Sequence, residues 1–332
     1  MKGSRLLEAT GSVGRLLSVP SFTLALALVL VVTSGSAVQG VEADALGPND
    51  TEAVEADVFS ASALPEGLSL VALVDDEWRV LVAEAGRLVA LADVAHPRSI
   101  AYHHGARRLA WIGADNRLRE RDLESGVTES LGQDDGLARY TQPSYSPDGR
   151  RLLAVELPDG KSRSTRIVAF DLAAGERHYL VRKRTAQFEP HMGSARTLHY
   201  TTAICVDDCV GMIWELWERD LADGRQRQLT LLNAVSKSPR LGADGWLYFS
   251  SDAGGTGFHL WRIRPEPGSP PEQLTEGEVR DSDPSPGSDG VVHFVRHSRE
   301  GAALMRLVPG GEPVPVVLDE RIEDLRDLEL DP

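Results

Sequence analysis

Cysteine is scarce in this sequence: Cys205 and Cys209 are the only two among 332 residues. A metal site would need further ligands and a redox role would need an exposed thiolate, and the sequence indicates neither. The two cysteines bracket a short loop between two expected strands. In an exported protein an even cysteine count favours a disulfide, so we predict a Cys205–Cys209 bond that closes this loop.

Several enzyme motifs are also missing. The sequence contains no Gly-x-Ser-x-Gly elbow, and we expect no hydrolase domain after its last repeat. It contains no His-x-His or His-Glu-x-x-His pair, so these common metal-ligand spacings are absent. The absence of these catalytic and metal-ligand motifs favours a non-catalytic protein.

No long stretch has the apolar period of a helix, so we expect little helix.

Positive charge is in deficit. The chain has 35 Lys and Arg against 50 Asp and Glu, a net charge of -15, which argues against nucleic acid as a partner. One dense basic cluster interrupts this pattern, formed by Arg182, Lys183 and Arg184. Such a run is either a solvated loop or a patch that binds an anionic partner, and we treat it as the candidate partner-binding site.

The N-terminus has the layout of a secretory signal. Basic residues precede an apolar run at 22–32, which is short for a membrane span, and Gly35-Ser36-Ala37 follows. We predict a signal peptide over residues 1–37, cleaved after Ala37, and a periplasmic or secreted protein. The alternative is an inner-membrane anchor formed by residues 22–32. No cysteine lies near the cleavage site, so a lipoprotein is not expected.

An acidic segment follows the signal. Residues 38–66 carry seven acidic side chains, no basic one and no sustained apolar period. This composition predicts a flexible linker. The remaining residues, 67–332, contain the repeats described next and form the expected folded domain.

A repeat organises that domain. Its fullest copy is Pro143-Ser144-Tyr145-Ser146-Pro147-Asp148-Gly149, a short strand and tight turn followed by the apolar strand Leu152–Val155. Prolines at 97, 143, 190, 239 and 284 begin successive copies, so the steps are 46, 47, 49 and 45 residues. A period of about 40 to 50 residues with several strands per copy is typical of β-propeller blades.

The two ends of the domain complete each other. Residues 68–92 read as three strands that lack a preceding inner strand, and Leu325–Leu330 reads as one strand with none after it. We therefore predict that both ends share a blade. The fold class is all-β: a six-bladed propeller of four-stranded antiparallel blades, closed by N- and C-terminal strands and free of open sheet edges.

The repeat resembles that of the TolB-like, WD40-like propeller family, whose core is a proline, an aromatic residue and Ser-Pro-Asp-Gly. We expect no counterpart of the α/β domain that precedes the TolB propeller, because the segment before the repeats is too short for one. We therefore expect an exported, monomeric scaffold that binds a protein or small-molecule partner in the cell envelope, with no cofactor. The alternative is a polysaccharide-lyase-type enzyme, because some TolB-like propellers act as oligogalacturonate lyases with a metal in a His-rich channel.

Turn geometry and packing explain most of the aspartates and histidines that recur in the repeats. Asp148, Asp244 and Asp289 occupy equivalent turns, where a carboxylate bonds nearby backbone amides. His199 and His293 occupy matching positions in second strands, which indicates packing. His191 is expected on an inner strand and is the candidate ligand if the channel holds a metal.

Overall fold

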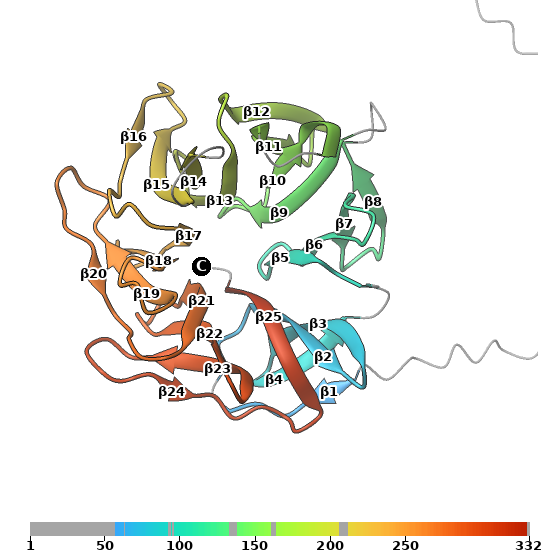
Figure 1. Ribbon diagram of the computed structural model, residues 1–332. Helices are drawn as coiled ribbons and strands as arrows, with labels where there is room; N and C mark the ends of the chain where they lie inside the picture. The colour runs from blue at the N-terminus through green and yellow to red at the C-terminus, as the bar shows by residue number, and fades with distance from the viewer. Residues whose placement is uncertain are drawn as a thin grey trace, which may run out of the picture. The chain divides into compact units, whose positions relative to one another are not determined.

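The computed structural model describes residues 57–62, 64–91, 94, 96–132, 138–160, 164–205 and 212–330. In this part of the chain six β-sheets stand around a central axis like the blades of a propeller (Figure 1). The expected signal, its alternative anchor and most of the expected linker lie outside the described residues. Within the described ranges, no helix is both long and apolar enough to cross a membrane, and the single helical turn is η1, Pro158–Gly160.

Blade 1 is built from both ends of the described chain. Its strand order is β1-β4-β3-β2-β25, and β25 pairs antiparallel with β2 from Leu68↔Leu330 to Val74↔Ile322. The shared blade predicted from the sequence is therefore confirmed. The strands are β1 (Val58–Phe59), β2 (Leu68–Val74), β3 (Glu77–Glu84), β4 (Arg87–Leu91) and β25 (Ile322–Leu330).

Blades 2 to 6 each have four antiparallel strands, which run from the inner to the outer strand along the sequence. Blade 2 comprises β5 (Ser99–His103), β6 (Arg108–Ile112), β7 (Leu118–Asp122) and β8 (Thr128–Leu131). Blade 3 comprises β9 (Arg139–Tyr145), β10 (Arg151–Leu157), β11 (Arg166–Asp171) and β12 (Glu176–Arg182). Blade 4 comprises β13 (Gln187–Ser194), β14 (Thr197–Cys205), β15 (Ile213–Asp220) and β16 (Gln226–Gln228).

The last two blades repeat the same plan. Blade 5 comprises β17 (Ser236–Leu241), β18 (Leu247–Ser251), β19 (His259–Ile263) and β20 (Glu272–Gln273). Blade 6 comprises β21 (Arg280–Pro286), β22 (Val292–Ser298), β23 (Gly301–Leu307) and β24 (Val314–Pro315). Their outer strands, β20 and β24, are only two residues long.

Strand β1 differs from the expectation for the linker. It lies inside the range 38–66, yet it pairs with β4, and the Phe59 side chain is fully buried against blade 1. Burying one aromatic side chain contributes about 1.5–3 kcal/mol, which outweighs the acidic composition around it. The described end of this segment, residues 57–62, is thus part of the propeller.

The core lies between the blades rather than inside one sheet. Each of six apolar clusters of described residues contains side chains from two neighbouring blades. Between blades 3 and 4, for example, Leu153 and Ile167 pack with Leu198 and Tyr200. Because both faces of a blade are covered, strands such as β2 and β10 read as apolar runs. The same packing holds every blade at a fixed angle to the axis.

The Ser-Pro-Asp-Gly turn is stabilised by its own side chains. Ser146 Oγ donates to Asp148 Oδ1 over 2.6 Å, Asp148 Oδ1 accepts the N–H of Arg150, and Gly149 has a φ of 64°. Asp244 and Asp289 accept the N–H two residues further on at distances of 3.1 and 3.0 Å. These contacts support the turn interpretation of the three aspartates.

Candidate functional site

A ring of polar residues surrounds the axis where the inner strands approach one another. Five of its members have positive φ between 51° and 55°, namely Gln142, Glu189, Ser238, Asp283 and Asp327. Four of them directly precede a repeat proline, and all five coincide with a shift in strand register. A β-bulge re-aims a side chain, and here it turns the ring residues toward a cavity of about 80 Å³.

The ring side chains bond from one blade to the next. Gln142 Oε1 accepts the N–H of Glu189 over 3.0 Å, and Glu189 Oε2 in turn accepts the N–H of Ser238. On the other side, Asp327 Oδ2 of blade 1 accepts the N–H of Ile100 on blade 2, and Ser99 Oγ of blade 2 accepts the N–H of Gln142 over 3.3 Å. Bulges free the amides of Gln142, Glu189 and Ser238, and the neighbouring blade satisfies each of them.

Burial changes the ionisation of two ring carboxyls. Burial, and next the charge of Asp283, raise the pKa of Asp327 to about 8, so this carboxyl is mostly protonated at neutral pH. Burial also raises the pKa of Glu189, although the bond from the Ser238 N–H acts in the opposite direction. The axis therefore carries less negative charge than its three carboxyl groups suggest.

His191 lies beyond the ring, on the inner strand β13 as expected from the sequence. It lines a second, smaller cavity of about 20 Å³, and Arg240 lines both cavities. The imidazole is 7% exposed, and its Nε2 has no hydrogen-bond partner. Burial, followed by the charge of Arg240, holds the pKa of His191 well below its ordinary value. The imidazole of His191 is therefore neutral, and the positive charge of Arg240 disfavours its protonation.

The described residues contain no group of three or more His, Cys, Asp or Glu side chains arranged to hold a metal ion. His191 thus stands without the companions that a channel metal would need. The other two histidines that we considered are buried in second strands. His199 Nε2 lies 3.2 Å from Glu218 Oε2, and burial lowers the pKa of His293 to about 4.

The basic cluster does not form one continuous patch. Arg182 ends β12 and is exposed, and Arg184 is exposed in the link to β13. Lys183 is half-buried: its Nζ lies 4.1 Å from the centre of the Trp217 ring and donates to Tyr200 Oη over 3.2 Å. Burial lowers the pKa of Lys183. Two of the three residues are thus available to a partner, and the third packs against blade 4.

Sequence reasoning missed the other members of this surface. The guanidinium carbons of Arg166, Arg177 and Arg182 lie 5.6, 5.6 and 5.7 Å from the centre of the Tyr179 ring. We call these four residues the arginine–tyrosine patch. Arg177 and Tyr179 alternate on β12, a signal that was visible in the sequence. The contribution of Arg166 depends on the pairing of β11 with β12, which the sequence did not specify.

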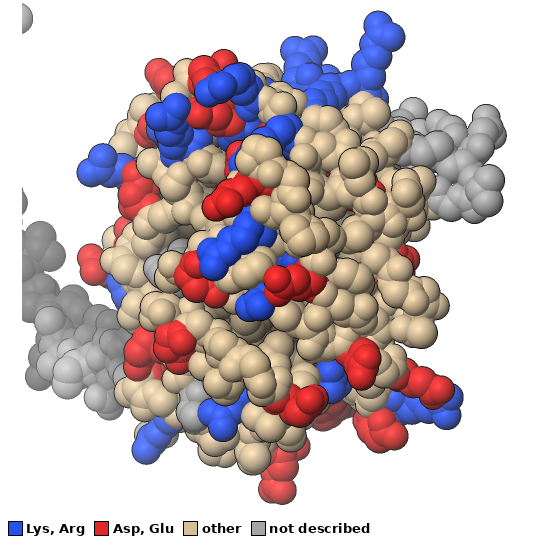
Figure 2. Space-filling view, turned by 90° about the vertical axis from the view of Figure 1, so that its left-hand side faces the viewer, with Lys and Arg blue, Asp and Glu red and all other residues tan. Residues whose placement is uncertain are grey.

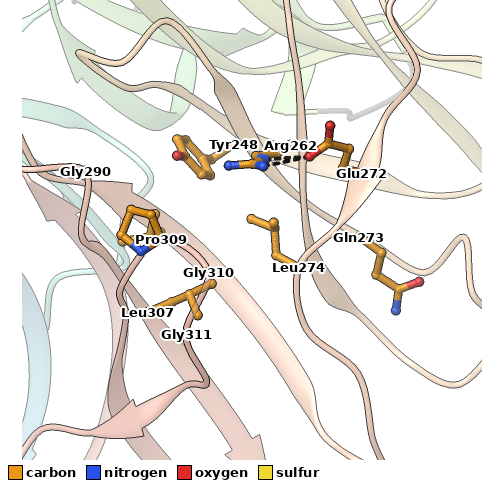
Figure 3. A pocket seen from close by; sticks show the side chains of 11 residues that line it. Tyr248, Arg262, Glu272, Gln273, Leu274, Gly290, Leu307, Pro309, Gly310 and Gly311 are labelled. Carbon is orange, nitrogen blue, oxygen red and sulfur yellow. Dashed lines mark hydrogen bonds and ion pairs between the residues drawn. The ribbon is translucent and has the colours of Figure 1, made fainter.

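Grooves open between neighbouring blades at the rim. One of about 330 Å³ lies between blades 5 and 6, lined by Leu274, Leu307 and Pro309 among others (Figure 3). Its arginine is neutralised, since Arg262 donates twice to Glu272 Oε2 over 2.8 and 2.9 Å. A groove of about 320 Å³ at the equivalent place between blades 2 and 3 is lined in part by Arg177 of the patch. Glu120, Glu129 and Asp171 line this second groove as well, so its own lining is not basic.

The predicted disulfide lies at the limit of the described chain. The backbone of Cys205 ends β14, opposite Ile213, but Cys209 is outside the described residues. The Cys205–Cys209 bond therefore stays a prediction.

Comparison with known proteins gives a match in structure but not in sequence. Neither the scan of protein-family models nor the search of curated proteins finds a match. Among solved structures, the chain is similar to TolB from Acinetobacter baumannii, with a TM-score of 0.64 and 16% identity over 80% of this chain. It spans 66% of that TolB chain, slightly less than two thirds of its length.

Two further structures show the range of propellers with this architecture. A putative TolB from Agrobacterium tumefaciens gives a TM-score of 0.56 at 18% identity, covering 79% of this chain and 90% of that one. An oligogalacturonate lyase in complex with manganese gives 0.55 at 12% identity, covering 78% and 83%. Likeness at these identities shows the fold alone. The neighbours include TolB propellers and a lyase, so they do not separate a scaffold from an enzyme.

Proposed function

We propose that this chain is an exported, non-catalytic binding scaffold of the cell envelope, and that it docks a partner protein through surface side chains rather than inside the channel. The observation that supports this most directly is the use of the axial ring. Its oxygens accept backbone N–H groups of the next blade, so the side chains nearest the axis act in holding the blades together.

The candidate docking residues are Arg182 and Arg184 at the end of blade 3. Both side chains are exposed, and Arg182 has no carboxylate partner among the residues described. Exposed charge that is not needed for folding is available for steering a partner of opposite charge. Lys183, which lies between them in sequence, packs against Trp217 on blade 4 and so anchors this segment to that blade.

Proximity labelling in the native host tests the scaffold function. The full chain, fused to a labelling enzyme, should enrich one or a few exported proteins over a secreted control. N-terminal sequencing of the same material should give a chain that begins near Val38. An intact Met1 in a soluble cytoplasmic fraction would contradict the export part of the proposal, and an intact membrane-bound chain would favour the anchor.

An enzyme assay tests the opposing hypothesis. Purified protein is incubated with oligogalacturonate and Mn²⁺, and the unsaturated product that a lyase forms is followed by ultraviolet absorbance. We expect no product. Turnover above a heat-denatured control, lost in His191→Ala, would replace the scaffold function with a lyase function that uses the channel.

A further inference from the structure

The side chain of Tyr179 on β12 is 41% exposed, and three arginines surround its ring. The pairing of β11 with β12 explains how they meet. Arg166 lies opposite Arg182, and Tyr179 lies opposite Val168, two residues along β11 from Arg166. Arg166, Arg182 and Tyr179 therefore share one face of the sheet, and Arg177 precedes Tyr179 by two residues on the same strand.

Folding alone does not account for this arrangement. Like charges directly opposite each other destabilise a sheet, and the Arg166–Arg182 pair is such a case. Glu156 is buried beneath the patch and accepts bonds from Arg166 and Arg177 over 3.4 and 3.2 Å. That is one negative charge against three positive charges. The patch thus keeps about two uncompensated charges in a chain whose net charge is -15.

Tyr179 and Arg182 are the accessible members of the patch, and the side chains of Arg166 and Arg177 are 28% and 24% exposed. Strand β12 is the outer strand of blade 3, and no strand lies beyond it in the described chain (Figure 1). It has seven residues, whereas β8, β16, β20 and β24 have four, three, two and two. The upper edge of the molecule in Figure 2, where Figure 1 places β12 and β16, carries basic side chains together with acidic ones. The longest of these outer strands, β12, ends with the exposed Arg182.

We propose that the arginine–tyrosine patch binds a short acidic peptide segment of a partner protein. This inference rests on the proposed scaffold function and names the class of its partner. Guanidinium groups bind carboxylates in a planar, bidentate manner, and an exposed tyrosine is a common anchor at the centre of an interface. The two arginines that β12 contributes, Arg177 and Arg182, are five residues apart, so an extended peptide can present a separate carboxylate to each.

A peptide fits this surface better than a long polyanion. Two uncompensated charges suit a few carboxylates, whereas the net charge of -15 repels an extended chain of phosphates or uronates. Glu129 also lines the groove between blades 2 and 3, which limits the basic area to the patch itself.

Fluorescence anisotropy tests the inference on the full chain. The probe is a labelled ten-residue peptide of alternating glutamate and serine. Wild-type protein should bind it at low ionic strength and less tightly as salt rises, since exposed charges are screened. The double variant Tyr179→Ser/Arg182→Ser should raise the Kd about tenfold, the loss of one or two interface anchors. Tyr179→Phe should bind like wild type, because the ring face is kept.

Arg299→Ser is the matched control, since this arginine on blade 6 is 93% exposed and lies far along the chain from the patch. Thermal unfolding verifies that each variant folds. If Tyr179→Ser/Arg182→Ser does not fold, Arg182→Glu provides a second test. Equal Kd values for Tyr179→Ser/Arg182→Ser and Arg299→Ser would overturn the inference. So would the absence of binding to wild type. Binding of oligogalacturonate in place of the peptide would overturn the partner class. If a partner found by proximity labelling binds Tyr179→Ser/Arg182→Ser as tightly as wild type, the inference fails and the scaffold function stands.

Discussion

Gln142 on blade 3 and Glu189 on blade 4 bond to each other twice. Gln142 Oε1 accepts the Glu189 N–H over 3.0 Å, and Gln142 Nε2 donates to Glu189 Oε1 over 3.4 Å. Both residues have a left-handed backbone and stand before a repeat proline. Such a conformation costs a non-glycine residue about 1–2 kcal/mol, so the bonds between blades compensate for strain at the axis.

Replacing Glu189 should therefore weaken the whole propeller. In Glu189→Ala the N–H of Ser238 and the amide of Gln142 lose their acceptor, which costs about 1–3 kcal/mol for buried groups. Glu189→Gln keeps one acceptor oxygen and should lose less. Urea unfolding of both variants measures the difference. Equal stability of Glu189→Ala and wild type would show that the ring does not hold the blades.

The ionisation of Asp327 predicts a pH dependence of stability. Its pKa in the folded protein is about 8, above the ordinary value of 3.8, so the folded state binds more protons between these values. Its contribution is complete below about pH 4 and is lost as the pH rises through 8. The stability of wild type relative to Asp327→Asn should therefore fall between pH 5 and 8, by at most about 1.4 kcal/mol per unit.

Denaturant titrations across this pH range provide the measurement. Asn can still accept the N–H of Ile100, so the variant should fold. Asp76→Asn, in the exposed turn after β2, serves as the control and should follow wild type at every pH. A pH-independent difference between wild type and Asp327→Asn would mean that Asp327 is charged throughout.

Removing residues 321–332 should open the closed propeller at blade 1. The deletion takes away β25, whose buried side chains Leu325, Leu328 and Leu330 pack in blade 1. Each contributes about 1.5–3 kcal/mol, a large share of the stability of one domain. We expect aggregation or a much lower Tm. Deletion of residues 331–332 alone is the control, and a full truncation with unchanged Tm would refute closure by β25.

Lys183 and Arg184 are neighbours with different roles. Lys183→Ser removes the cation from the Trp217 ring and the bond to Tyr200, so we expect a loss of about 1–2 kcal/mol. Arg184→Ser changes an exposed side chain and should stay within about 0.5 kcal/mol of wild type. Thermal unfolding compares the two. A loss in Lys183→Ser no greater than that in Arg184→Ser would show that the contact of Lys183 with Trp217 adds nothing to stability.

The Cys205–Cys209 bond is tested by mass mapping of non-reduced peptides. Protein recovered from the exported fraction should give one disulfide within the loop. The loop is short, so its loss in Cys205→Ser/Cys209→Ser should cost less than the roughly 3 kcal/mol expected for a 15-residue loop. Two free thiols in that material would reject the bond.

The sequence by itself determined the architecture. Its prolines return every 45 to 49 residues with turns and apolar strands between them, and a strand is missing at one end and left over at the other. These features depend on local turn geometry and on the alternation of side chains, which neighbouring residues specify. They were sufficient to predict six blades and their closure. The buried position of Phe59 was not, because an isolated apolar residue in an acidic segment has no period.

Only the tertiary structure decided which polar residues meet. Gln142 and Glu189 are 47 residues apart and touch because two bulges face the same axis. Lys183 looked like a member of a basic run, yet its partner is Trp217 on the next blade. Tyr179 gathers three arginines because β11 and β12 pair in one particular register. Such contacts depend on strand register and on the packing of blades, and residues close in sequence do not encode them.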